Sequence, residues 1–159
     1  MELFPMNAGL SQTRAIIRLI KERKGGSIEV SKIAQETRKS IDALFPLIDA
    51  CRILGLCTIQ NGVIKLTDVG ESITPKTFAS VMARELVRIE PFQSIMAIMH
   101  QHERLTSPQL AEQLKRRGIT FYNEEETNAE LLKNMLLRWG VRNKLLNYDS
   151  ATDIWSSRI

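Results

Sequence analysis

The sequence contains few of the residues on which metal sites and disulfide-stabilised folds depend, with only two cysteines and two histidines among its 159 residues. Cys51 and Cys57 stand in apolar stretches and lack the C-x-x-C spacing of a zinc site. On a helix, the side chains of His100 and His102 would point about 200° apart, which suits neither chelation nor a shared role as a base. We therefore expect no metal, no cofactor and no disulfide framework, and the cysteine usage fits a reducing cytoplasm.

Sequence signatures of nucleotide-binding and catalytic sites are also missing. The chain has neither a G-x-x-x-x-G-K-S/T phosphate loop nor a G-x-G-x-x-G loop, and no residues suggest a nucleophile paired with a base. No apolar run approaches the ~18 residues that a membrane span requires. The first residues lack the basic start and apolar stretch of a secretory signal. The sequence thus predicts a protein that is not an enzyme and has no segment inserted in a membrane.

What the sequence does contain is a strong signal for a β-hairpin in its first half. Apolar runs at Leu56–Gln60 and Val63–Leu66 flank the dipeptide Asn61-Gly62. A type I′ turn needs a positive φ at both central residues, and Asn-Gly adopts it most readily. The helix expected before this hairpin, at about residues 40–54, carries apolar residues at helical spacing: Ile41, Leu44, Phe45 and Ile48. A short helix followed by a tight hairpin is typical of the recognition helix and wing of a winged helix-turn-helix.

Two further helices are expected before this pair. After a loosely ordered start at residues 1–12, the pattern predicts a helix at about residues 13–24 and another at about 29–36. Gly25-Gly26 separates them, because glycine commonly ends a helix. Three helices and a hairpin complete one winged-helix unit.

The second half of the sequence repeats this plan in outline. A helix is expected to begin at Thr74-Pro75 and to end at Pro91, and a second helix follows at about 92–102. A third helix is capped by Ser107-Pro108, and a fourth begins with the capping box Thr127–Glu130. Strands are expected at about 145–148 and 153–156. We therefore predict a mainly α fold with small β-hairpins (α+β), arranged as two tandem winged helix-turn-helix domains. The predicted divisions are residues 1–73 with the wing Leu56–Leu66, a connecting helix at 74–90, and residues 91–159.

The net charge of +4 is unevenly distributed along the chain. Residues 1–65 hold ten Lys/Arg and six Asp/Glu, whereas residues 66–159 hold twelve of each kind. Any electrostatic attraction to nucleic acid should therefore lie in the first unit, although an excess of this size also serves solubility alone. The residues that would contact DNA, at the start of the third helix and on the wing, are Arg38, Lys39, Ser40, Gln60, Asn61 and Lys65. Asp42 counts against a fit to the groove, and the acidic run Glu124–Glu126 disfavours DNA binding by the second unit.

Four stretches of the chain carry a resemblance to a known domain family: IDALFPLIDACRILGL, VIKLTDVG, EPF and LRWGVRNKLLNYD. From Gly25 to about Trp155 the chain resembles the C-terminal AAA-associated domain, which follows the ATP-binding cassette in archaeal and bacterial transporter ATPases of the nitrate/sulfonate/bicarbonate type. The resemblance implies a tandem winged-helix module without catalytic residues of its own. It implies no ligand or site residues that map onto this sequence.

Two functions remain open on this basis. The first is a non-catalytic regulatory or interaction module with a protein partner, such as the ATPase subunit of an ABC transporter. The second is a transcriptional regulator that binds double-stranded DNA through the first unit. A homodimer formed by the apolar faces of the helices at 74–90 and 92–102 is a further expectation.

Overall fold

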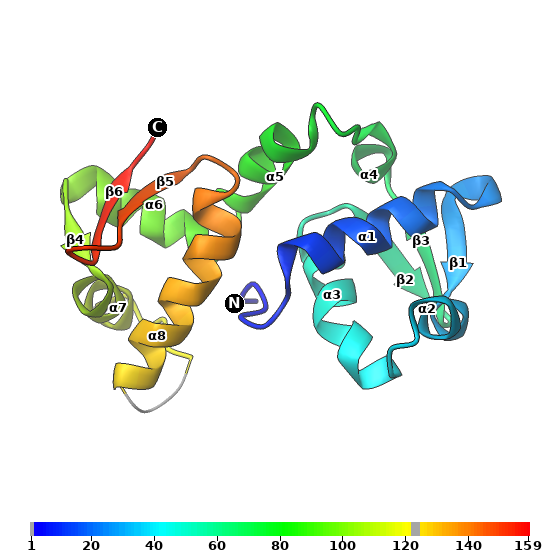
Figure 1. Ribbon diagram of the computed structural model, residues 1–159, viewed down its shortest axis with the longest axis horizontal. Helices are drawn as coiled ribbons and strands as arrows, with labels where there is room; N and C mark the ends of the chain where they lie inside the picture. The colour runs from blue at the N-terminus through cyan, green and yellow to red at the C-terminus, as the bar shows by residue number, and fades with distance from the viewer. Residues whose placement is uncertain (1, 122–124) are drawn as a thin grey trace. The chain divides into compact units, whose positions relative to one another are not determined.

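The computed structural model describes residues 2–121 and 125–159, which form a mainly helical protein with two small sheets (Figure 1). Each sheet has three antiparallel strands. The predicted fold class, mainly α with small β-hairpins, is confirmed. The chain separates into two compact units. We call Asn7–Phe78 the N-terminal unit, and Ala79–Ile159 together with the residues through Met6 the C-terminal unit.

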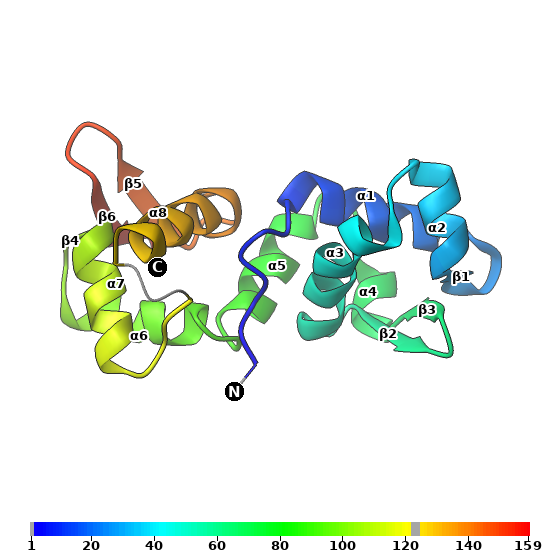
Figure 2. The same cartoon turned by 90° about the horizontal axis from the view of Figure 1, so that it is seen from below.

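The N-terminal unit combines helices with the first of the two sheets. Its elements are α1 (Leu10–Lys21), the 3₁₀ turn η1 (Lys24–Gly26), β1 (Ser27–Glu29), α2 (Val30–Thr37), α3 (Ile41–Ile53), β2 (Cys57–Gln60), β3 (Val63–Leu66) and α4 (Asp68–Ser72). In the sheet, β3 lies between β1 and β2. Figure 2 shows the same elements from a second side. The three helices expected from the sequence are present, and β1 is an additional strand.

The predicted hairpin is confirmed at its turn. Asn61 and Gly62 both have a positive φ, 53° and 75° respectively, and Gln60 pairs with Val63 across the turn. Both central residues therefore have the backbone sign that a type I′ turn requires.

The segment after the hairpin contains Leu66, Thr67 and Gly70, an L-T-x-x-G motif within the stretch VIKLTDVG. Thr67 caps α4, since its hydroxyl oxygen accepts a hydrogen bond from the amide of Gly70 at 3.2 Å. The Thr67 hydroxyl also donates to the carbonyl oxygen of Gly55 at 2.6 Å, which ties α4 back to the end of α3. At Gly70 a Cβ would lie 2.1 Å from the carbonyl oxygen of Leu56, so only glycine fits this close approach.

The helix α3 is capped by Ser40 and buries only part of its apolar stripe. Ser40 is the N-cap, and its Oγ accepts a hydrogen bond from the amide of Ala43 at 3.1 Å. Leu44 and Ile48 are buried, whereas Ile41 and Phe45 are exposed. All four belong to one apolar stripe in the sequence, but α3 turns only the side of Leu44 and Ile48 toward the core. Ile41 and Phe45 therefore lie one turn apart on its outer side.

The C-terminal unit contains the remaining helices and the second sheet. Its elements are α5 (Phe78–Leu86, whose first residue belongs to the N-terminal unit), α6 (Phe92–Gln101), β4 (Leu105–Thr106), α7 (Ser107–Arg116), α8 (Glu125–Met135), the π-helical turn η2 (Leu136–Val141), β5 (Leu146–Asp149) and β6 (Ile154–Ser157). In the sheet, β6 lies between β4 and β5. The order helix, strand, helix, helix, strand, strand therefore occurs in both units, and in each sheet the last strand lies in the middle.

The first residues of the chain belong to the core of the C-terminal unit, so the expectation of a loosely ordered start is wrong. The Phe4 side chain is 1% exposed. Its ring packs edge-on against Phe92 at a centroid distance of 5.8 Å and against Trp139 at 4.6 Å. The Phe4 amide donates to the carbonyl oxygen of Glu90 at 2.8 Å, next to the parallel bridge between Leu3 and Glu90.

Three helix starts differ from the sequence expectations. Thr74 forms a turn, with a hydrogen bond from the amide of Thr77 to its hydroxyl at 3.2 Å, and α5 begins only at Phe78. The cap of α7 is Thr106 rather than Ser107, because Thr106 and Gln109 form a reciprocal capping box. The helix α8 begins at Glu125, before the expected capping residue.

No helix within residues 2–121 and 125–159 combines the length and the apolar character that crossing a bilayer requires.

Candidate interaction surfaces

The sequence places three of its six candidate DNA contacts in the turn between α2 and α3. Arg38 is exposed and ends α2 in a left-handed conformation, with φ 56°. Lys39 is half-buried. The hydroxyl of Ser40 already accepts the capping hydrogen bond of α3. This turn therefore presents one fully exposed cation beside the start of the helix.

The other three candidates, Gln60, Asn61 and Lys65, are exposed on the hairpin. The outward face of the sheet is mixed in character, because side chains directly opposite each other in register lie on the same face. Lys65 is opposite Thr58, and Val63 is opposite both Gln60 and Glu29. In the described part of the chain, no ion pair joins the hairpin candidates to those of the α2–α3 turn. The hairpin thus does not form a continuous basic strip.

Exposed apolar side chains gather on the same two elements. Among the residues that the structure describes, the exposed large hydrophobic side chains are Ile41 (45%), Phe45 (48%), Ile59 (38%), Val63 (37%) and Ile159 (78%). The first two lie on α3 and the next two on the hairpin, so four of the five belong to these elements. Ile41 and Phe45 lie one turn apart on α3, whereas Ile59, opposite Ile64, and Val63, opposite Gln60, lie on opposite faces of the hairpin. Isolated exposed apolar residues are ordinary, so the pair on α3 is the one that suggests an interaction surface.

The exposed side of α3 carries little positive charge. Asp42 is exposed in the first turn of the helix. Arg52, near its end, forms an ion pair with Asp49 at 3.5 Å. A groove of DNA favours uncompensated cations, whereas the outer side of α3 offers Ile41 and Phe45 beside an acidic residue. The electrostatics of this helix therefore suit a protein surface better than a phosphate backbone.

Cys51 lies in the last turn of α3 and Cys57 is the first residue of β2, and both are buried free thiols. A hydrogen bond between them raises the pKa of Cys51, to which burial adds, and lowers the pKa of Cys57. Among the described residues, no group of three or more His, Cys, Asp or Glu side chains could hold a metal ion. The cysteines form part of the core, as the sequence suggested.

A hydrogen-bonded cluster joins the second hairpin to the start of α7. The Asp153 carboxylate accepts hydrogen bonds from the amide of Ser107 at 3.0 Å, from its hydroxyl at 2.5 Å and from the Tyr148 hydroxyl at 2.8 Å. The indole of Trp155 donates to the Ser107 hydroxyl at 2.9 Å. We call these four residues the Asp153 cluster. Nothing in the sequence pattern marked it, because Ser107 and Asp153 are 46 positions apart.

The Asp153 cluster shifts the acidities of its own members. Burial raises the pKa of Tyr148 to about 12, and the hydrogen bond to Asp153 adds to the shift. Burial also opposes ionisation of Asp153, but the hydrogen bonds from Ser107 and Tyr148, together with the charge of Lys133, hold the pKa of that carboxyl below its ordinary value. Asp153 is therefore a carboxylate that acts as an acceptor within the structure.

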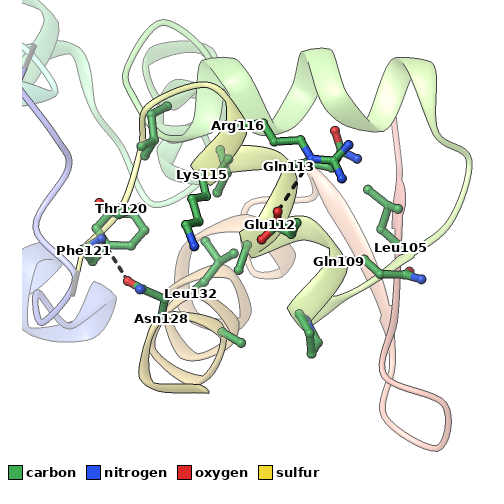
Figure 3. Close-up of a pocket in the computed structure, with 15 residues that line it drawn as sticks. Leu105, Gln109, Glu112, Gln113, Lys115, Arg116, Thr120, Phe121, Asn128 and Leu132 are labelled. Carbon is green, nitrogen blue, oxygen red and sulfur yellow. Dashed lines mark hydrogen bonds and ion pairs between the residues drawn. The ribbon is translucent and has the colours of Figure 1, made fainter. Parts of the chain in front are cut away.

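A pocket of about 540 Å³ lies between α7 and the first turns of α8 (Figure 3). Several of its polar lining residues form internal contacts. Glu112 and Arg116 form an ion pair across one turn of α7 at 3.7 Å, and Asn128 accepts a hydrogen bond from the amide of Phe121 at 2.9 Å. Residues 122–124 follow Phe121 and lie outside the described part of the chain.

Some predictions fall where the structure gives no side-chain information. The acidic run Glu124–Glu126 and the capping residue Thr127 lie outside the side chains that it describes. The faces proposed for a homodimer are described, and their principal apolar residues are buried within the chain: Val81, Met82 and Leu86 of α5, and Phe92, Ile95 and Met99 of α6. These side chains of α5 and α6 are therefore packed in the core of the chain itself.

The model of the C-terminal AAA-associated domain matches residues 31–149. The chain belongs to this family. The match includes α3, the hairpin and the L-T-x-x-G motif of the N-terminal unit, and it continues to β5 of the C-terminal unit. Comparisons with curated proteins and with solved structures gave no match. The family description connects the chain with AAA-type ATPases.

Proposed function

We propose that this AAA-associated domain is a non-catalytic docking module for the ATPase subunit of an ABC-type transporter, and that it binds through the outer side of α3. The observation that carries the proposal is the exposure of Ile41 and Phe45, one turn apart on that helix. The family membership supplies the kind of partner.

The proposal includes a winged-helix architecture for each unit. The supporting observation is that helix, strand, helix, helix, strand, strand recurs with the last strand central in each sheet. In such a domain α3 corresponds to the helix that reads DNA in regulators. Here that helix exposes apolar side chains, so we infer that the same position serves protein recognition.

The two exposed side chains of α3 supply part of the free energy that binding a partner requires. Complete burial of a Phe or Ile side chain contributes about 1.5–3 kcal/mol. Since Ile41 and Phe45 are each about half exposed, covering the remainder would contribute about 1 kcal/mol per residue. A partner that covers both gains about a factor of 30 in affinity from these two side chains.

The alternative is that the N-terminal unit binds double-stranded DNA, with Arg38, Lys39 and Lys65 as phosphate contacts. The basic excess of residues 1–65 supports this alternative. Asp42 and the paired Arg52 count against it. The two proposals make opposite predictions for salt dependence, because phosphate contacts weaken steeply with ionic strength and apolar contacts do not.

The test measures binding of the full chain to purified ATP-binding-cassette subunits of nitrate/sulfonate/bicarbonate type from the source organism. We expect a complex that tolerates moderate salt and that Phe45→Glu weakens at least tenfold, or about 1.4 kcal/mol. Ile159→Glu places the same charge on an exposed apolar residue elsewhere and should leave the affinity unchanged.

Two outcomes would reject the docking proposal. One is the absence of binding to any such subunit; the other is equal binding by the wild type and Phe45→Glu. A mobility shift with duplex DNA that disappears in Arg38→Glu/Lys39→Glu would instead support the DNA alternative.

A further inference from the structure

A second concave surface, on α1 of the N-terminal unit, combines cations with apolar side chains. It is a groove of about 390 Å³ between α1 and the segment 73–78. Its apolar lining consists of Ile17, Ile73, Pro75 and Phe78, and its charged lining consists of Arg14, Arg18, Lys21 and Glu22. We call it the α1 groove. It involves neither α3 nor the hairpin, so it is independent of the docking face proposed above.

Two of the three cations are held in position by the opposite wall of the α1 groove. The guanidinium carbon of Arg14 lies 4.6 Å from the centroid of the Phe78 ring, in a cation–π contact. The ammonium group of Lys21 donates a hydrogen bond to the carbonyl oxygen of Ile73. Charged groups that are already ordered lose less entropy when a ligand binds. The groove thus presents positive charge at fixed places.

The lining of the α1 groove carries more positive than negative charge. None of the ion pairs among described residues includes Arg14, Arg18 or Lys21. Glu22 is the one acidic residue in the lining. At a rise of 1.5 Å per residue, the cations span about 10 Å along one side of α1. An occupant of complementary chemistry therefore carries negative charges distributed over a similar length.

We propose that the α1 groove binds an acidic peptide segment of a protein partner, with carboxylates on Arg14, Arg18 and Lys21 and an apolar side chain against Pro75, the exposed member of the apolar lining. A guanidinium stacked on a ring keeps its N–H edge available for bidentate contact with a carboxylate. Acidic residues one turn apart on a partner helix reproduce the spacing of the cations. A phosphodiester backbone would meet the charges but would bring no apolar group to the floor of the groove.

The experiment selects short random peptides on the immobilised full chain, in parallel with the Arg18→Glu variant. The Arg18 side chain is exposed and takes part in none of the ion pairs among the described residues, so this substitution should not disturb the fold. We expect peptides enriched on the wild type to carry at least two Asp or Glu residues near an aliphatic or aromatic residue. Arg18→Glu should lower the affinity of a synthesised peptide about tenfold, and added salt should weaken binding.

Two control variants test whether the loss of peptide affinity is specific to the α1 groove. Lys32→Glu makes the same charge change on an exposed position of α2 outside the groove and should leave peptide affinity unchanged. Phe45→Glu should also leave it unchanged, so that failure of the ATPase-docking proposal does not decide this one. Enrichment of peptides without acidic residues, or no preference for the wild type over Arg18→Glu, would overturn the proposal. Stronger, Arg18-dependent binding of a short DNA duplex would overturn it in favour of nucleic acid.

Discussion

Replacement of Asp153 tests whether a polar cluster holds the second hairpin against α7. The carboxylate accepts three hydrogen bonds, two of them from Ser107 at the first turn of the helix. A negative charge at this place also interacts favourably with the helix dipole. The residue has a left-handed backbone, with φ 53°, so substitution by alanine would add strain. Asp153→Gly and Asp153→Asn are the informative variants, because both residues accept that conformation.

The expected loss follows from the number of hydrogen bonds and from their exposure. A hydrogen bond to a charged group contributes about 1.5–3 kcal/mol when it is shielded from water. Asp153 is half-buried, so water can form part of the hydrogen bonding that its carboxylate provides. We therefore expect Asp153→Gly to lower the free energy of unfolding by about 2 kcal/mol. Asp153→Asn keeps one acceptor oxygen and should lower it by about 1 kcal/mol.

The pH dependence provides a second measurement of the same cluster. The pKa of Asp153 is below its ordinary value, so the folded state favours the ionised form. Its contribution to stability is therefore present above the ordinary Asp pKa of about 3.9 and is lost as the pH falls through the lower value of the folded state. The difference between wild type and Asp153→Asn should be largest near neutral pH and should shrink in acid.

The assay is urea unfolding followed by tryptophan fluorescence. Both tryptophans of the sequence, Trp139 and Trp155, are in the C-terminal unit, so the signal reports unfolding of the unit that contains the substitution. Equal free energies of unfolding for the wild type and Asp153→Gly at neutral pH would refute the reasoning. A difference from Asp153→Asn that stays constant into acid would refute the electrostatic part alone.

Two further predictions concern packing. Phe4→Ala should lower the free energy of unfolding of the C-terminal unit by about 3 kcal/mol, because it leaves a cavity against Trp139 and Phe92; an unchanged unfolding curve by tryptophan fluorescence would show that the N-terminal residues do not occupy this core. Gly70→Ala should destabilise the N-terminal unit by about 3 kcal/mol or more in thermal unfolding followed by circular dichroism, since its Cβ would lie 2.1 Å from a backbone oxygen. Gly9→Ala, whose Cβ would meet the flexible Gln12 side chain, is the control.

The parts of the fold that local chemistry determines could be predicted from the sequence. The hairpin follows from Asn61-Gly62, because the turn type depends on those two residues alone. The cap of α3 follows from Ser40. The burial of Phe4 could not be predicted, because its partner Trp139 is far away in the sequence and only the folded chain brings the two rings together.

The candidate surfaces were less accessible to sequence reasoning than the fold. Apolar periodicity in the sequence identified the apolar stripe on α3. The periodicity does not show how many residues of the stripe the core covers, and the side chains of Ile41 and Phe45 are exposed. The α1 groove needs the segment 73–78 as its second wall, which no local pattern reveals. The spacing of Arg14, Arg18 and Lys21 was visible as one side of a helix, but their apolar companions were not.

The place of Phe4 in the core makes the C-terminal unit discontinuous along the chain. A fragment that starts at Ala79 lacks a ring on which Trp139 rests, and a separate peptide covering the first residues is the natural means of restoring it. The same arrangement determines where a fusion is attached. A protein fused ahead of residue 2 is attached next to the C-terminal unit, although the sequence that follows the first residues forms the N-terminal unit.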